Sequence, residues 1–187
     1  STNDRTERDL QMKILIIGGG GMIGQKLAGR LAEDGRLGER EISELTLFDV
    51  VSPAAPEDAT FPVKLRTGDL SNADEAKALV AEQPDIIFHL AAIVSGEAEE
   101  DFAKGYRINL DGTRHLLDAV CAIEEYVPRV VFTSSIAVFG APFPDAISDD
   151  FHTTPLTSYG TQKAIGELLL SDFSRRGMMD GIGIRLP

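Results

Sequence analysis

A cluster of glycines follows a short apolar run near the start of the chain and leads into an amphipathic stretch. The apolar run is KILII (residues 13–17), and the amphipathic stretch is MIGQKLAGRLAEDG. The glycine spacing is Gly18-x-x-Gly21-x-x-Gly24. Glycine permits a tight turn and lets the backbone approach a phosphate, whose charge suits a helix N-terminus. Three glycines alone could mark no more than a turn, but their place between a predicted strand and a predicted helix favours binding of a dinucleotide pyrophosphate.

The rest of the chain repeats this alternation of apolar runs and helical patterns. Further strands are predicted at residues 45–49, 63–69, 85–90 and 129–135 and from Gly181, and helices at residues 72–83, about 99–123 and 158–177. Strands without polar alternation are buried on both faces, as in a parallel sheet covered by helices. The sequence therefore predicts an α/β fold with a doubly wound parallel Rossmann-type sheet and helices on both faces.

Length and composition predict one domain. The polar residues 1–11 are expected to be a disordered extension, and residues 12–187 a single NAD-binding domain that also carries the catalytic residues. The net charge of −12 disfavours nucleic acid or an acidic membrane as partner. No apolar run reaches the ~20 residues of a membrane span, and we expect no signal peptide because the opening is polar. Cys121 is the only cysteine and the histidines are dispersed, so we expect a cytoplasmic protein without a metal site.

Two aspartates stand at the ends of predicted strands. Asp49 ends the second strand, where its carboxylate can accept hydrogen bonds from ribose hydroxyls and repel a 2′-phosphate. No Arg or Lys follows in Val50 and Val51, so NAD is predicted rather than NADP. Asp69 ends the third strand, where it can either meet the adenine amino group or cap the following helix, and the sequence favours neither role.

Tyr159 and Lys163 lie four residues apart in a predicted helix, and hence on one face. A tyrosine with an ordinary pKa near ~10 is a poor base at neutral pH, and a nearby ammonium lowers that pKa. Such a pair can take a proton from an alcohol or return it to a carbonyl. The Tyr-x-x-x-Lys spacing is common by chance, and Ser135 could do no more than form a turn at the end of its strand. However, Ser135 is expected at the same carboxyl edge of the sheet as the glycine loop, where its hydroxyl can hydrogen-bond the reacting oxygen. We predict a catalytic Ser135/Tyr159/Lys163 centre with hydride transfer to NAD.

Together, the segments GGGGMIG, GDL, HLAA, NLDGT, TSSIAVFG and YGTQK resemble the extended short-chain dehydrogenase/reductase family, the NAD-dependent epimerase/dehydratase group, over residues 12–187. The resemblance implies that the backbone of Met22 and Ile23 faces the pyrophosphate and that Asp69 and Leu70 border adenine. It implies that Asn109 orders the site and that Lys163 both tunes Tyr159 and binds the nicotinamide ribose. It also implies a cofactor-lining segment made of Leu90, Ala91, Ala92, Ile93 and Val94.

The chain departs from the family pattern at a few places. Ile17 replaces the usual Thr before the glycines, and Phe139 replaces a common Tyr. The chain stops at RLP, where the family continues into a C-terminal substrate subdomain, so we expect most specificity residues to be missing from it.

Within the family, the segments IVSGEAEEDF, HTTPLTSYGTQKA and GIGIRLP are most similar to dehydrogenases that oxidise a four-carbon sugar acid at carbon 2. A nucleotide-sugar epimerase would use the same Ser/Tyr/Lys centre and stays open. A dehydratase is disfavoured, because Ile136 and Ala137 stand where an Asp-Glu pair is needed. A non-catalytic NAD-binding protein has no need of Tyr159 with Lys163. The expected partner is a sugar acid or nucleotide sugar, and a homodimer through the helices at residues 99–123 and 158–177 is an open alternative.

Overall fold

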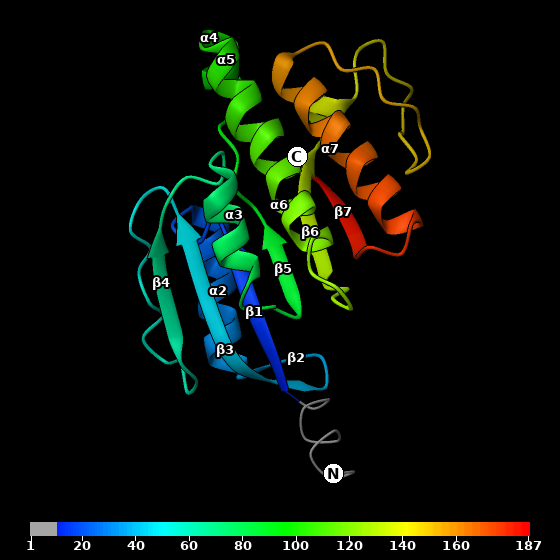
Figure 1. The fold of residues 1–187 in the computed structure, drawn as a ribbon. Coiled ribbons are helices and arrows are strands. Elements are labelled where there is room, and N and C mark those ends of the chain that lie inside the picture. Colours follow the sequence, from blue (N-terminus) through cyan, green and yellow to red (C-terminus); the bar gives the residue numbers. More distant parts are fainter. Residues whose placement is uncertain (1–10) are drawn as a thin grey trace.

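The apolar runs form one seven-stranded sheet in the computed structural model, which describes residues 11–187 (Figure 1). The strands are β1 (Gln11–Ile17), β2 (Arg36–Leu37), β3 (Arg40–Asp49), β4 (Val63–Thr67), β5 (Ile86–His89), β6 (Arg129–Ser135) and β7 (Asp180–Leu186). Six of them run parallel in the order β4-β3-β1-β5-β6-β7, while the short β2 pairs antiparallel with β3. The predicted doubly wound parallel sheet is thereby confirmed. Residues 1–10 of the expected extension lie outside the described residues, and Gln11 is the first residue of β1.

Helices cover both faces of this sheet. They are α2 (Met22–Asp34), α3 (Ala73–Val80), α4 (Ser95–Glu100), α5 (Phe102–Gly105), α6 (Gly112–Cys121) and α7 (Ser158–Arg175). Figure 1 shows α3, α6 and α7 in front of the sheet and α2 behind it. Among the residues of the described chain, no helix is both long and apolar enough to span a bilayer.

The core follows the alternation of side chains along the strands. In β1, Leu15 and Ile17 belong to the cluster that packs with α3, α6 and α7. Ile14 and Ile16 belong to the cluster on the α2 side. Burial on both faces explains why β1 reads as an uninterrupted apolar run in the sequence.

The predicted helix over residues 99–123 is helical for most of its length, but it is interrupted at Asp101. α4 ends before Asp101, and α5, a π-helix η1 (Tyr106–Asp111) and α6 then follow one another without a gap. Asp101 leaves the helical conformation, with φ −124° and ψ 86°, and its carboxylate accepts a hydrogen bond from the Lys104 backbone N–H at the start of α5. A side-chain cap of this kind competes with continuation of the helix. The π-helix η1 comes directly before α6, and single π-helical turns inside α-helices occur often at functional sites.

Candidate functional site

The glycine loop joins β1 to α2 at the carboxyl edge of the sheet, the upper edge in Figure 1. Gly18 has φ +91°, a conformation that only glycine adopts at little cost, and its N–H donates to the Phe48 carbonyl at 2.8 Å. At Gly24, an added Cβ would lie 2.1 Å from the Gly18 carbonyl oxygen. The loop and the first turn of α2 therefore touch backbone to backbone. No side chain caps α2 at Gly21, so its first N–H groups remain available to an anion.

Met22 and Ile23 open α2 and are both exposed, Met22 at 72% of its residue surface. This placement agrees with a role for their backbone rather than their side chains. It remains a prediction that this backbone contacts a pyrophosphate.

Asp49 lies beside the glycine loop at the end of β3. Its carboxylate accepts hydrogen bonds from the Gly20 N–H at 2.9 Å and from the Val50 N–H at 2.7 Å. Val50 and Val51 next to it are exposed. These two hydrogen bonds fix Asp49 at the loop. Neither of the two residues that follow it carries a positive charge that could neutralise a 2′-phosphate.

Asp69 is not the cap of the helix that follows it. The N-cap of α3 is Asn72, whose side chain accepts from the Asp74 N–H at 3.0 Å. Asp69 instead accepts from the Ser71 N–H at 2.9 Å and pairs with the Arg107 guanidinium at 3.2 Å. Burial raises the pKa of the Asp69 carboxyl, but its hydrogen bonds with Ser71 and the charge of Arg107 outweigh burial and leave the pKa below its usual value.

A small pocket lies between these two aspartates. Its lining residues are Ile17, Gly18, Phe48, Asp49, Val50, Asp69, Leu70, His89, Ala91 and Ile108. It therefore joins the ends of β1, β3 and β5 with η1. Five of its residues are predicted to contact the cofactor, namely Gly18, Asp49, Asp69, Leu70 and Ala91.

The segment Leu90–Val94 follows β5 and packs against the glycine loop. Leu90 N–H donates to the Ile17 carbonyl at 2.8 Å, and an added Cβ at Gly18 would lie 2.8 Å from the Ala91 nitrogen. Further along, Asn109 of η1 binds both backbone groups of Ile93. Its Oδ1 accepts from the Ile93 N–H at 2.9 Å, and its Nδ2 donates to the Ile93 carbonyl at 3.2 Å.

Ser135, Tyr159 and Lys163 come together where β6 ends and α7 begins. Ser135 is the last residue of β6, and its hydroxyl lies close enough to the Tyr159 phenol to lower the pKa of that phenol. Lys163 is buried, and its ammonium donates to the Thr133 carbonyl at 2.7 Å and lies 5.7 Å from the centre of the Tyr159 ring. The three side chains form one cluster at the same sheet edge as the glycine loop. Whether this cluster is catalytic remains a prediction.

Burial dominates the electrostatics of the cluster. It raises the pKa of Tyr159, and the neighbouring Ser135 hydroxyl offsets this in part. The direction is opposite to the one expected from a lysine on the same helix face. Burial also lowers the pKa of Lys163 to about 8. The ammonium donates to a strand carbonyl and lies over the Tyr159 ring. The tuning of Tyr159 by Lys163 remains a prediction.

The buried ammonium of Lys163 makes stability depend on alkaline pH. The unfolded lysine has its ordinary pKa of 10.5, and the folded one about 8. Between these values the unfolded chain binds more protons, so stability rises with pH, and the cost of burial is fully present only below about pH 8. We expect Lys163→Met to be more stable than the unsubstituted protein at pH 7 by up to about 3 kcal/mol, less the lost bond to Thr133. That advantage should shrink toward pH 10.5.

Urea unfolding at pH 7, 9 and 10.5 measures this difference. Replacement of the exposed Lys26 by Met is the matched control, and it should leave the pH dependence of the unsubstituted protein in place. Parallel pH curves for Lys163→Met and the unsubstituted protein would contradict the expectation.

The sequence analysis missed two parts of the site. Gln162, between Tyr159 and Lys163, is fully buried and bonds to Asn109. Glu167, one turn beyond Lys163, accepts from the Ser134 hydroxyl and forms a two-point ion pair with Arg185 of β7, at 2.9 and 2.8 Å. Glu167 could have been predicted, because it follows Lys163 by four residues and therefore lies on the same face of the helix as Tyr159 and Lys163. No sequence signal pointed to Gln162.

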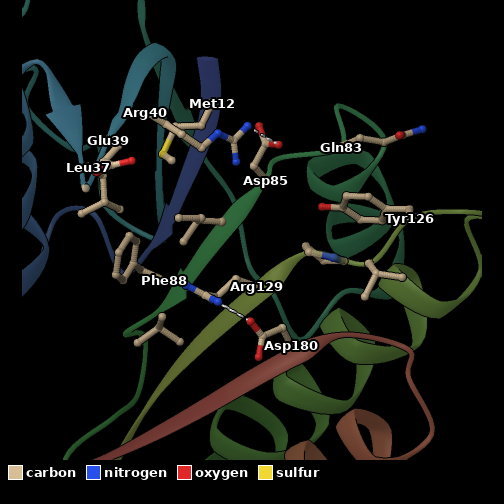
Figure 2. A pocket seen from close by; sticks show the side chains of 15 residues that line it. Met12, Leu37, Glu39, Arg40, Gln83, Asp85, Phe88, Tyr126, Arg129 and Asp180 are labelled. Carbon is tan, nitrogen blue, oxygen red and sulfur yellow. Dashed lines mark hydrogen bonds and ion pairs between the residues drawn. The ribbon is translucent and has the colours of Figure 1, made fainter. Parts of the chain in front are cut away.

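A larger pocket of about 850 Å³ lies at the opposite edge of the sheet (Figure 2). Its wall includes Met12, Asp85 and Arg129, which lie at or next to the amino ends of their strands, and its rim carries the ion pairs Arg40–Asp85 and Arg129–Asp180. Phe88 and Val131 line it on the sheet face that carries α2. Ligands of doubly wound sheets bind beyond the carboxyl ends of the strands, so this pocket is not the predicted cofactor site.

Neither metal nor thiol chemistry is indicated by the described residues. Within residues 11–187, no three His, Cys, Asp or Glu side chains are grouped to hold a metal ion. Burial raises the pKa of the Cys121 thiol, which contacts the Met178 sulfur at 3.3 Å. A thiol with a raised pKa is a poor nucleophile.

Comparison with known proteins places this geometry in context. The sequence profile of the NAD dependent epimerase/dehydratase family matches residues 14–187. The D-erythronate dehydrogenase of Cupriavidus necator is 48% identical over 94% of the chain and 55% of its own length. The D-erythronate dehydrogenase of Haemophilus influenzae is 43% identical over 94% of the chain and 54% of its own length. The chain thus spans about half the length of the curated relatives it matches.

Solved structures agree on the fold. A crystal structure described as the nucleoside-diphosphate-sugar epimerase from Agrobacterium tumefaciens is 64% identical, with a TM-score of 0.92 over 95% of this chain and 53% of that one. The UDP-glucose 4-epimerase from Brucella ovis, solved in complex with NAD, is 28% identical, with a TM-score of 0.76 over 93% of this chain and 51% of that one.

Proposed function

Because the chain belongs to the NAD dependent epimerase/dehydratase family, we propose that it supplies the NAD-binding and catalytic residues of an enzyme that oxidises a hydroxyl of a small sugar acid. The proposed substrate is D-erythronate or a similar four-carbon acid, oxidised at carbon 2. The observation that carries the proposal is the Ser135/Tyr159/Lys163 cluster beside the glycine loop, in a chain 48% identical to a D-erythronate dehydrogenase.

The residues at the carboxyl edge fit NAD. The close approach at Gly24 leaves the uncapped start of α2 open to a pyrophosphate. Asp49 lies where it would accept from the adenosine ribose and exclude a 2′-phosphate. Leu90, Ala91, Ala92, Ile93 and Val94 would line the cofactor, with Asn109 holding this segment. When bound, NAD supplies a nicotinamide that accepts a hydride from the carbon being oxidised.

The chain's own residues would handle the proton. Ser135 donates a hydrogen bond that holds the substrate oxygen next to the Tyr159 phenol. The proton of the substrate hydroxyl passes to the Tyr159 oxygen, which must therefore be ionised first. Burial opposes that ionisation in the present structure. In this proposal Lys163 supplies the positive charge that favours the phenolate and also binds the nicotinamide ribose.

A second candidate is a nucleoside-diphosphate-sugar epimerase, which is favoured by the 64% identity to the Agrobacterium tumefaciens structure described in that way. Such an enzyme takes the hydride from the substrate and returns it, so free NAD is not consumed. The Ser/Tyr/Lys cluster serves both reactions. The two candidates therefore differ in net turnover of NAD rather than in catalytic residues.

In the deciding experiment, the full-length protein is mixed with NAD and with D-erythronate, other four-carbon acids or UDP-sugars. Formation of NADH is followed by its absorbance. We expect sustained NADH formation with a four-carbon acid and at least about 10-fold slower turnover with NADP, because of Asp49. Interconversion of a nucleotide sugar at constant NAD, without NADH from any acid, would replace this proposal with the epimerase.

A further inference from the structure

Gln162 connects α7 to the segment that follows β5. Its side chain is fully buried, and its Oε1 accepts a hydrogen bond from Asn109 Nδ2 at 2.8 Å. Asn109 in turn binds both the N–H and the carbonyl of Ile93. A continuous chain of hydrogen bonds therefore runs from the residue before Lys163 to the backbone of the Leu90–Val94 segment.

The orientation of both amides follows from Ile93. Its N–H can only donate, so the oxygen of Asn109 must face it, and the Asn109 nitrogen must then face the Ile93 carbonyl and Gln162. Gln162 must present its oxygen to that nitrogen. Its own Nε2 is left without a hydrogen-bond partner among residues 11–187, although the atom is buried.

An unpaired buried N–H is unfavourable, so packing alone does not account for glutamine at this position. An apolar side chain of the same length would fill the space without that cost. The fold also makes room for the amide, because Gly105 lies against it. An added Cβ at Gly105 would stand 2.9 Å from Gln162 Nε2. The group that distinguishes glutamine from its apolar equivalents here is the oxygen that Asn109 binds.

We propose that Gln162 is a positioning residue, which acts through Asn109 to hold the Leu90–Val94 segment in register with Tyr159 and Lys163. The segment packs against the glycine loop at Ala91 and against Asn109 at Ile93. Gln162 thus fixes one wall of the proposed NAD site relative to the helix that carries the proposed proton acceptor. The inference rests on the proposed function for its catalytic consequence, but its structural part stands without bound NAD.

The test compares Gln162→Met with the unsubstituted full-length protein. Methionine keeps the length of the side chain and removes both the acceptor and the unpaired N–H. We expect amide hydrogen exchange at Ile93 to become about 10-fold faster, while the Leu90 amide, bonded to Ile17, exchanges as before. The Kd for NAD should rise about 5-fold and kcat should fall about 10-fold, because the cofactor wall is no longer fixed. The midpoint of urea unfolding should change little, because the variant loses a hydrogen bond but also an unpaired donor.

A double-mutant cycle separates this role from general packing. In an Asn109→Ala background, Gln162→Met should no longer change Ile93 exchange or the Kd for NAD, since the intermediate residue is gone. Gln83→Met is the matched control at an exposed glutamine far from the site, and Gln162→Ser gives the same readouts if the methionine variant does not fold. Unchanged Ile93 exchange and unchanged Kd in Gln162→Met, or equal effects in both backgrounds, would overturn the inference. Absence of NAD binding by the unsubstituted protein would instead refute the proposed function, and the exchange measurement would still decide the role of Gln162.

Discussion

Replacement of Tyr159 by phenylalanine is expected to lower kcat by about 10³-fold while the Kd for NAD stays within about 3-fold of its original value. The substitution removes one oxygen, the proposed proton acceptor, from a side chain that is half-buried beside Ser135. The ring that packs near Lys163 remains. NADH formation with a four-carbon acid measures kcat, and titration with NAD in the absence of substrate measures affinity.

Tyr126→Phe is the matched control for this experiment. The Tyr126 hydroxyl donates to the Pro84 carbonyl at 2.6 Å, at the opposite edge of the sheet. Its loss should cost about 1 kcal/mol of stability and leave kcat unchanged. If Tyr159→Phe retained full turnover, Tyr159 would not be the proton acceptor, and a non-catalytic NAD-binding protein would be the better description.

Replacement of Gly24 by alanine is expected to weaken NAD binding by about 100-fold and to destabilise the fold by about 3 kcal/mol. The added methyl group would lie 2.1 Å from the Gly18 carbonyl oxygen and 2.9 Å from the Gly19 Cα. Both atoms belong to the backbone, so the start of α2 must move away from the loop. Titration with NAD and urea unfolding measure the two effects.

Gly29 provides the control in the same helix. An added Cβ at this exposed position meets nothing within 4 Å. Gly29→Ala should therefore keep NAD affinity and raise stability by about 0.5–1 kcal/mol, because alanine loses less backbone entropy in a helix. Equal loss of NAD affinity in both variants would show that the close approach at Gly24 is not what shapes the site.

The parallel sheet could be predicted from the sequence because its strands are buried on both faces. β1 and β6 are apolar for most of their length and are bounded by turn residues, so their place was clear. The first half of β3 was missed because residues 40–44 (REISE) contain a single apolar residue, Ile42. The break at Asp101 was missed because a helical pattern on both sides hides a single side-chain cap. At Asp101 a side-chain cap interrupts the helix, although the helical pattern of the sequence continues on both sides.

The site could be predicted only as far as spacing determines it. The i, i+4 relation of Tyr159 and Lys163 places them on one helix face, but it does not fix how deeply each side chain is buried. Burial sets the pKa of both groups, and it depends on β6 and on the packing of α7. Gln162 has no sequence signature because its importance comes from a partner 53 residues away.

The strand order has a consequence for how the chain assembles during synthesis. β1 lies in the centre of the sheet, and β3 and β5 pair with its two sides. β4 adds to β3, β6 adds to β5, and β7 adds to β6. Every parallel strand after β1 thus joins an edge that is already available when the strand leaves the ribosome, and none must be inserted between two paired strands. The sheet can therefore grow outward in the order of translation, without a later strand having to separate two that have already paired.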